Sequence, residues 1–232
     1  MKKLRDFVKL SMQRSIFFNK TVGPLLRVYS FFKKKWVNKN FQNNGPELLA
    51  YFKDCLDKHQ LKFWLINGTL LGAYREKRLL THDLDLDVAM FAEDRQQVQA
   101  ALEAGGFKLI HEFGVSGEGI KEHAYSYKNV KIDVFFTEKE NNSFISYIFY
   151  KEVYTSVQND FKVIKLILPE TGFVEYDFLG GKYLIPEKTK ECLIANYGEN
   201  FMIPDKSWDY TKDIPSAVYY KLEEKQGYHI QY

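Results

Sequence analysis

Cysteine is scarce in this sequence, and long apolar runs are absent. The two cysteines, Cys55 and Cys192, lie far apart and form no CxxC pair, so they indicate neither a disulfide framework nor a zinc site. No stretch approaches the roughly 18 apolar residues that a membrane span requires. Charged residues interrupt every candidate signal-peptide core, and there is no internal repeat or low-complexity tract. We therefore expect a globular protein of a reducing, cytoplasmic compartment.

The composition is that of an ordinary globular protein with many aromatic residues. Of the 232 residues, 45% are hydrophobic, 27% are charged and 16% are aromatic. A chain of this length can form one large domain, or one domain with appendages. The aromatic side chains suit both a stable core and aromatic-lined clefts.

Positive charge is concentrated at the start of the chain. Residues 1–40 contain 11 Lys/Arg and one acid, Asp6, whereas the remainder contains 22 basic and 29 acidic residues. Bulky apolar side chains interleave with the basic ones, which is typical of amphipathic segments that bind surfaces. We expect peripheral contact of residues 1–38 with an anionic membrane and no nucleic-acid partner. Packing of this segment on its own domain, or an oligomer contact, is the alternative.

A polar stretch separates this basic arm from the rest of the chain. Residues 38–46 have the sequence NKNFQNNGP, which predicts a turn-rich boundary. We expect a helix to begin at Pro46 and to run to about His59, with Leu49, Phe52 and Leu56 on one face. The predicted organisation is a basic amphipathic arm over residues 1–45 and a body over residues 46–232.

The body alternates between strand and helix patterns. We expect Asn67 to Thr69 to form a turn after the first strand, and Lys128 to lie at the turn of a hairpin. The predicted strands are 62–66, 83–89, 107–111, 125–127, 129–136, 161–168 and 173–178, and the predicted helices are 70–76, 92–104 and 187–196. The fold class is thus mixed α/β (α+β), with a small mixed sheet flanked by helices and a helical, aromatic-rich C-terminal extension.

The run Asp83-Leu84-Asp85-Leu86-Asp87 is the main candidate for chemistry. On a strand the three carboxylates project from one face, where they repel one another unless a cation joins them. An all-oxygen set of this kind suits Mg²⁺ or Mn²⁺. An EF-hand loop is excluded, because its sixth and twelfth positions would be Val88 and Asp94. A solvated acidic edge strand is the alternative.

Further candidates lie before and after this run. Asp133 sits in an alternating apolar strand, where an unpaired charge is costly; pairing with a lysine is the alternative. Gly68 and Thr69 follow a strand and open a helix, whose first N–H groups can hold a phosphate. Arg75, about two turns into that helix, can bind phosphate or form a surface salt bridge. This order of elements fits a nucleotidyltransferase-fold site, as in polymerase-β-like enzymes, in which metal-binding carboxylates bridge phosphates.

Four segments together resemble the LicD/fukutin family of nucleotidyltransferase-fold transferases, and the spacing is closer to fukutin. These segments, with Trp208-Asp209-Tyr210, are 63–76 (FWLINGTLLGAYRE), 81–90 (THDLDLDVAM), 130–136 (VKIDVFF) and 195–204 (ANYGENFMIP). The resemblance implies Mg²⁺- or Mn²⁺-dependent transfer of an alcohol phosphate. It favours ribitol or glycerol phosphate over choline phosphate. The implied donor is a CDP-alcohol, the implied acceptor is a cell-surface or lipid-linked glycan, and CMP is released.

The same resemblance implies roles for individual residues. Asp85 and Asp87 take the metal-binding positions, and Asp133 takes the later acid that ligates metal and activates the acceptor hydroxyl. Gly68, Thr69 and Arg75 would hold the nucleotide phosphates. Where many phosphocholine transferases have Trp-Asp-Asp-Asp, this chain has His82-Asp83-Leu84-Asp85, so Asp83 would support the site and the choline reaction is less favoured. The implied substrate-contacting residues are His82, Asp83, Tyr197, Trp208 and Asp209.

Two other classes of function stay open on the sequence. One is a nucleotidyltransferase that moves NMP onto a small molecule. The other is a non-catalytic module of a glycan-assembly complex, which the presence of all three carboxylates disfavours.

Overall fold

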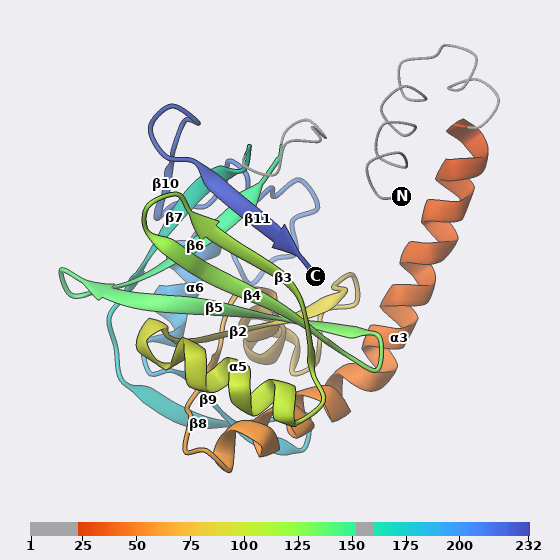
Figure 1. Cartoon of the computed structure of the whole chain (residues 1–232), viewed down its shortest axis with the longest axis horizontal. Helices are drawn as coiled ribbons and strands as arrows, with labels where there is room; N and C mark the ends of the chain where they lie inside the picture. Colours follow the sequence, from red (N-terminus) through yellow and green to blue (C-terminus); the bar gives the residue numbers. More distant parts are fainter. Residues whose placement is uncertain (1–22, 152–159) are drawn as a thin grey trace.

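The chain folds into one large mixed sheet with helices against its faces (Figure 1). A computed structural model describes residues 23–151 and 160–232. Its helices are α3 (Gly23–Asp57), α4 (Asn67–Leu71), the π-helical turn η1 (Gly72–Glu76), the 3₁₀ turn η2 (Ala92–Asp94), α5 (Arg95–Ala104) and α6 (Thr189–Tyr197). Its strands are β1 (Trp64–Leu65), β2 (Asp85–Phe91), β3 (Lys108–Val115), β4 (Gly119–Tyr127), β5 (Val130–Glu140), β6 (Ser143–Tyr150), β7 (Lys162–Pro169), β8 (Phe173–Phe178), β9 (Gly181–Pro186), β10 (Ala217–Tyr219) and β11 (Gly227–Gln231).

Strand β5 is the centre of the sheet. The order is β10-β7-β6-β5-β2-β1-β9-β8. Strand β5 also pairs with β4, and β4 continues the sheet through β3 to β11. The β2–β5 and β1–β9 pairs are parallel, and the other pairs are antiparallel. The mixed α/β class is confirmed, but with 11 strands the sheet is larger than expected.

Tight two-residue turns join three of the antiparallel pairs. Lys128–Asn129 between β4 and β5 and Asn141–Asn142 between β5 and β6 have positive φ at both positions, as do Leu179 and Gly180 between β8 and β9. Two successive residues with positive φ match the right-handed twist of the flanking strands. The predicted hairpin at Lys128 is therefore confirmed.

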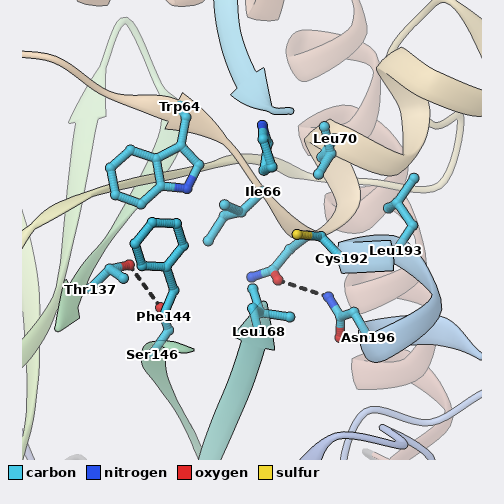
Figure 2. A pocket seen from close by; sticks show the side chains of 12 residues that line it. Trp64, Ile66, Leu70, Thr137, Phe144, Ser146, Leu168, Cys192, Leu193 and Asn196 are labelled. Carbon is cyan, nitrogen blue, oxygen red and sulfur yellow. Dashed lines mark hydrogen bonds between the residues drawn. The ribbon is translucent and has the colours of Figure 1, made fainter. Parts of the chain in front are cut away.

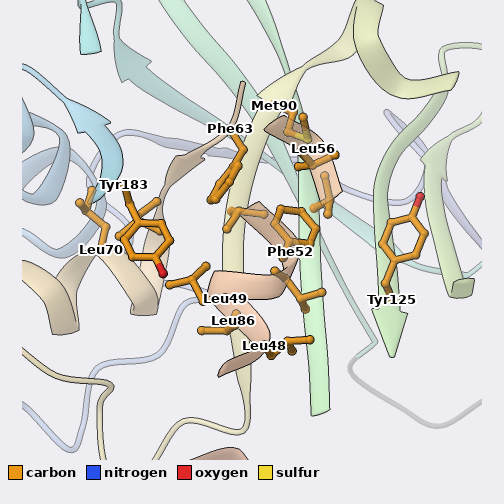
Figure 3. Close-up of a cluster of buried hydrophobic side chains, with 14 of the residues drawn as sticks. Leu48, Leu49, Phe52, Leu56, Phe63, Leu70, Leu86, Met90, Tyr125 and Tyr183 are labelled. Atoms are coloured by element: carbon orange, nitrogen blue, oxygen red, sulfur yellow. The ribbon is translucent and has the colours of Figure 1, made fainter. Parts of the chain in front are cut away.

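The main core lies between the sheet and the helices α3 and α5. Helix α3 buries one stripe of apolar residues at helical spacing, which includes Phe41, Leu49, Phe52 and Leu56. Figure 3 shows Leu49, Phe52 and Leu56 close to Leu86 and Met90 of β2. Full burial of each such side chain contributes about 1.5–3 kcal/mol, so this contact fixes β2 firmly.

The expected turn at residues 38–46 is wrong, because α3 passes through it without a break. Pro46 lies inside the helix, and Phe41 is 1% exposed. Polar side chains of this stretch find partners outside the helix backbone: Asn38 and Gln42 donate to carbonyls of residues 80–83. A division of the chain at residue 45 stays a prediction, and residues 1–22 of the predicted arm lie outside the described residues.

The C-terminal part is less helical than expected. It contains one helix, α6, whereas β7, β8, β9, β10 and β11 supply strands there. Strands β6, β9, β10 and β11 were missing from the sequence prediction. None of the helices within 23–151 and 160–232 is both long and apolar enough to cross a membrane.

Candidate active site

The parallel pairing of β2 with β5 brings the predicted carboxylates together. Asp87 is the register partner of Asp133, and Asp85 is the partner of Lys131. Register partners project from the same face of a sheet, so these four side chains form one charged group. Leu86 and Val88 point to the opposite face, where they are fully buried. The strand alternation predicted from the sequence thus holds for Asp85 and Asp87.

Lys131 joins two of the carboxylates. Its Nζ lies 2.7 Å from Oδ2 of Asp85 and 2.7 Å from Oδ2 of Asp133. Burial lowers the pKa of Lys131, but Asp133 and Asp85 outweigh burial and raise the pKa above its ordinary value. The alternative considered for Asp133, pairing with a lysine, therefore occurs inside the cluster.

The cluster carries more negative charge than Lys131 can balance. Burial, and then the neighbouring carboxylates, raise the pKa of Asp87 well above its ordinary value. Burial raises the pKa of Asp133 to about 6 against the effect of Lys131. Oδ1 of Asp133 is buried and has no hydrogen-bond partner among the described residues. Excess carboxylate charge and a vacant buried oxygen fit a hard divalent cation such as Mg²⁺ or Mn²⁺.

The carboxylates are not arranged as a ready-made metal centre. Within the described part of the chain, no three His, Cys, Asp or Glu side chains are placed to hold a metal ion. The ammonium group between Asp85 and Asp133 explains part of this, because it holds two of the predicted ligands. The metal and its ligands therefore stay a prediction.

Gly68 and Thr69 hold Asp87 in place. The backbone N–H of Gly68 donates to Oδ2 of Asp87 at 3.1 Å, and Oγ1 of Thr69 accepts from the N–H of Asp87 at 2.8 Å. A Cβ at position 68 would lie 2.7 Å from Oδ2 of Asp83 and 3.2 Å from Oδ2 of Asp87, so any larger residue would displace these carboxylates. Helix α4 begins at Asn67, three residues before the predicted helix, and the predicted turn forms its first residues. Phosphate binding by this segment stays a prediction.

Arg75 lies in η1 and forms the salt bridge that was the predicted alternative, but its side chain is largely buried and does not lie on the surface. Its Nη1 donates to the carbonyl of Phe201 at 3.0 Å, and its Nη2 pairs with Glu76 at 3.0 Å. Nε is buried without a hydrogen-bond partner in residues 23–151 or 160–232. Arg75 also opposes the rise in pKa of Asp83 and Tyr197, which places its charge beside the carboxylates.

Asp83 precedes strand β2, so its predicted place on the strand is wrong. Asn38 of α3 donates to the backbone carbonyl of Asp83 at 2.8 Å and to that of Thr81 at 2.9 Å. These bonds hold the turn against α3 and direct the Asp83 side chain toward Gly68. Burial, and then Asp85 and Glu76, raise the pKa of Asp83 to about 7. The His82 side chain is 75% exposed and reaches Asp83 only at 3.7 Å, so it stands at the rim.

An aromatic pair lies beside the carboxylates. Tyr197, the last residue of α6, packs against Trp208 with ring centroids 4.8 Å apart. Burial, and then Asp87 and Asp83, raise the pKa of Tyr197, which places its ring next to these acids. Nε1 of Trp208 is buried and lacks a hydrogen-bond partner among the residues described. Tyr197 also packs against the main core and Trp208 against the cluster that contains Leu166 and Ile214, as expected of plain core packing, the alternative role of these aromatic residues.

Asp209 has a local structural part. Its Oδ1 accepts from the N–H and the hydroxyl of Thr211, at 3.0 and 2.8 Å, and its own N–H donates to Asp213. These bonds hold a surface turn and lower the pKa of Asp209. The structure gives Asp209 no contact with the carboxylate cluster among the interactions of the described residues. Its predicted contact with substrate stays a prediction.

Two charged residues of the site, Glu122 and Lys131, were not identified from the sequence. Glu122 of β4 is 8% exposed, and because Ala124 pairs with Asp133, Glu122 projects from the same face as Asp133. Burial, and then Asp133, raise its pKa well above the ordinary value, while Lys131 opposes. Lys131 itself lies two residues before Asp133 and hence on its face. Extending the predicted hairpin beyond Tyr125 would have identified Glu122.

A small cavity lies deeper between the sheet and α6 (Figure 2). Its volume of about 20 Å³ is room for about one water molecule. Thr137 and Ser146 share a hydrogen bond of 2.9 Å in its wall, and Asn196 donates to Asn67 at 3.0 Å. The cavity is thus too small for a substrate, and its Asn67–Asn196 bond ties α6 to the start of α4.

Comparison with known proteins identifies the family. The family model described as "LicD/FKTN/FKRP, nucleotidyltransferase domain" matches residues 60–187. The human "Ribitol-5-phosphate transferase FKTN" is 29% identical over 178 residues, which are 76% of this chain and 37% of that protein. The uncharacterized protein T07A5.1 of Caenorhabditis elegans is 32% identical over 168 residues, or 68% of this chain and 42% of the relative.

The match to these relatives is partial in length. This chain spans about 37% of the length of the human FKTN protein. Among solved structures, the antibiotic-resistance factor ANT(2'')-Ia aligns with a TM-score of 0.46 and 16% identity, over 75% of this chain and 81% of that one. Since the family model covers more than half of the chain and includes Gly68, Asp85 and Asp133, this protein belongs to the LicD/FKTN/FKRP nucleotidyltransferase-domain family.

Proposed function

We propose that this protein is a metal-dependent transferase that moves ribitol phosphate, or glycerol phosphate, from a CDP-alcohol to a sugar hydroxyl of a glycan or lipid-linked glycan. The observation that carries the proposal is the placement of Asp85, Asp87 and Asp133 on one face of adjacent parallel strands, directly beside the start of α4. Membership of the family and the likeness to a ribitol-5-phosphate transferase support the choice of substrate class.

The proposed reaction exchanges one bond at phosphorus for another. The acceptor oxygen attacks the phosphorus that bears the alcohol, the bond from that phosphorus to the CMP oxygen breaks, and the acceptor proton passes to a carboxylate. The family resemblance assigns this proton to Asp133, which is buried at the centre of the cluster. CMP then leaves. Catalysis of this kind depends on positioning and on charge stabilisation.

The remaining residues of the site would bind the metal ion and orient the donor and the acceptor. Asp85, Asp87 and Asp133 would hold Mg²⁺ or Mn²⁺, which supplies positive charge to the diphosphate. The N–H groups at the start of α4 would face the same phosphates. Tyr197 and Trp208 offer an aromatic wall for the cytosine ring or the acceptor sugar, with Nε1 of Trp208 as an unused donor. The N–H of Gly68 and the hydroxyl of Thr69 keep Asp87 in position.

A panel of CDP-alcohols with Mg²⁺ tests the proposal, with CMP release as the measurement. We expect CMP from CDP-ribitol or CDP-glycerol, and no release in excess EDTA. CMP release from CDP-choline alone would show that the transferred group is choline phosphate and not a polyol phosphate. Pyrophosphate from an NTP, with no CMP from any CDP-alcohol, would contradict the proposal and favour nucleotidyl transfer.

A matched substitution separates site effects from general effects of charge. Asp85→Asn should abolish CMP release, whereas Asp177→Asn on β8 should leave it unchanged. Asp177 is a suitable control because its side chain is 88% exposed and pairs only loosely with Lys182, at 3.8 Å.

We also propose that the N-terminal half of α3 contacts an anionic membrane. This half extends beyond the sheet (Figure 1) and exposes Tyr29, Phe32 and Trp36 by 65%, 61% and 58%. Their spacing of three and four residues places them on one side of the helix, and Lys33 and Lys35 flank that side. Aromatic residues bordered by lysines suit the boundary between headgroups and acyl chains.

Co-sedimentation with liposomes tests this contact. The double variant Phe32→Ser, Trp36→Ser should lower binding to vesicles that contain phosphatidylserine at least fivefold, and added salt should weaken wild-type binding. Val174→Ser is the matched control, since Val174 is 41% exposed on β8. Equal binding of wild type and the double variant would contradict the proposal.

A further inference from the structure

The carboxylate cluster contains its own cation. Nζ of Lys131 lies 2.7 Å from one oxygen of Asp85 and 2.7 Å from one oxygen of Asp133, so the ammonium group bridges carboxylates of two neighbouring strands. The register holds it there, because Lys131 is the direct partner of Asp85 and lies two residues from Asp133 on the same face. Its side chain is 37% exposed, so the bridge borders the solvent side of the cluster.

The remaining acceptor oxygens have no cation. Asp87 receives only the N–H of Gly68 on Oδ2 and lies beside the free Oδ1 of Asp133. No ion pair to Asp87 occurs in the described residues. Lys131 therefore pairs with Asp85 and Asp133, whereas Asp87 has no paired side-chain cation in the part of the chain that the structure describes.

We infer that Lys131 permanently replaces one of two metal ions, so that Asp85, Asp87 and Asp133 together bind a single divalent cation. This inference rests on the proposed function for the identity of the site. Two-metal enzymes neutralise the attacking and leaving oxygens with two ions. In this chain the second positive charge comes from the Lys131 side chain, which contacts Asp85 and Asp133 at 2.7 Å each.

Counting bound Mn²⁺ tests the inference without any measurement of activity. Mn²⁺ is titrated into the metal-free full chain, and free ion is followed by electron paramagnetic resonance with calorimetry in parallel. We expect one equivalent in the wild type, one in Lys131→Arg, and two in Lys131→Met, because loss of the ammonium group opens the position between Asp85 and Asp133. Lys182→Met is the matched control and should keep one equivalent, since Lys182 is a surface lysine with 62% exposure.

The outcomes separate this inference from the proposed function. Two equivalents in the wild type would overturn the inference, even if Lys131→Met did not fold. One equivalent in Lys131→Met, with unchanged affinity and a cooperative unfolding transition, would overturn it as well. One equivalent in the wild type and two in Lys131→Met would support it even if no CDP-alcohol released CMP, a result that contradicts only the proposed function.

Discussion

Glu122 and His123 are neighbours on β4, but they serve opposite faces of the sheet and two different clusters. Glu122 projects toward Asp133 and Lys131, whereas His123 is the register partner of Val134 and points into the main core. Both side chains are buried, at 8% and 0% exposure. What distinguishes them is how far the chain itself supplies their polar partners.

The core-side cluster consists of His123, Tyr125, Glu112 and Tyr232, and the chain itself supplies most of its polar partners. The Tyr125 hydroxyl and Nδ1 of His123 are 2.9 Å apart, and the Tyr232 hydroxyl donates to Glu112. Nε2 of His123 lies 3.0 Å from Oε1 of Glu112, a contact that falls outside hydrogen-bond geometry. Burial, and then Arg95, lower the pKa of His123 to about 3, so its ring is neutral. We therefore interpret this cluster as structural.

The site-side cluster, formed by Asp85, Asp87, Asp133, Glu122 and Lys131, has more carboxylates than positive side chains. Several carboxylates share Lys131, and burial raises the pKa of Asp83 to about 7 and that of Asp133 to about 6. Buried charge without a partner is costly, so an excess of this kind indicates a ligand that completes the cluster. Burial of ionisable groups therefore does not mark a functional site by itself; an excess of buried charge of one sign does.

The largest expected effect is on activity, through the site-side cluster alone. Asp87→Asn should lower CMP release on the order of 10³-fold, because it removes a metal ligand while its size and Gly68 contact are kept. The measurement is initial-rate CMP release, with circular dichroism to check the fold. Activity within tenfold of the wild type would remove Asp87 from the proposed machinery.

The next effect is on stability, through the core-side cluster alone. Glu112→Ala should lower the free energy of unfolding by about 2 kcal/mol, since it removes a buried side chain that packs 3.0 Å from the His123 ring and accepts from the Tyr232 hydroxyl. Urea unfolding measures this change. CMP release per folded molecule should stay unchanged; a parallel loss of activity would show that the two clusters are not independent.

The two clusters should also respond to pH with opposite signs. Without metal, the folded chain binds more protons at Asp83 than the unfolded chain between about pH 4 and 7, so this residue lowers stability as pH rises. His123 binds more protons in the unfolded chain between about pH 3 and 6.5, so it lowers stability as pH falls.

Asp83→Asn isolates the first of these signs. At pH 8 it should raise the unfolding free energy of the metal-free protein by about 2 kcal/mol, and the gain should disappear by about pH 4. Unfolding curves across this range measure it. A gain that is the same at both pH values would mean that Asp83 acts by its shape and not by its charge.

The smallest effect belongs to the end of the chain. Tyr232→Phe removes one hydroxyl donor to Glu112 and should cost about 1 kcal/mol of stability, with no change in CMP release. Thermal unfolding is sensitive enough to measure it. A loss as large as that of Glu112→Ala would make Tyr232 the principal partner in the core-side cluster.

The sequence was sufficient for the residues whose position follows from strand alternation. Asp85, Asp87 and Asp133 alternate with aliphatic residues, so their common face could be predicted, and the pairing of β2 with β5 confirms that they share it. Asp83 shares the spacing but precedes β2, because α3 holds its turn through Asn38. A contact with a distant helix leaves no trace in local periodicity.

Other features depend on partners that the local sequence does not contain. The stretch of residues 38–46 is helical because Phe41 is buried in the core and the Gln42 side chain donates to the carbonyl of Leu80. Locally, its Asn, Gly and Pro residues favour a turn. Glu122 belongs to the site only because β4 pairs with β5 beyond the predicted hairpin. Lys131 could have been placed on the face of Asp133, but its bridge to Asp85 requires the register of a parallel pair.

The parallel pairing of β2 with β5 also has a consequence for the order of folding. Parallel neighbours need a long crossover, here through α5, β3 and β4, and such non-local pairs form slowly. Before β5 docks, Asp85 and Asp87 lie on a strand that water can solvate, and Asp133 is far away. Their mutual repulsion therefore arises only in the step that completes the sheet, and Lys131 arrives on the same strand as Asp133 to offset it.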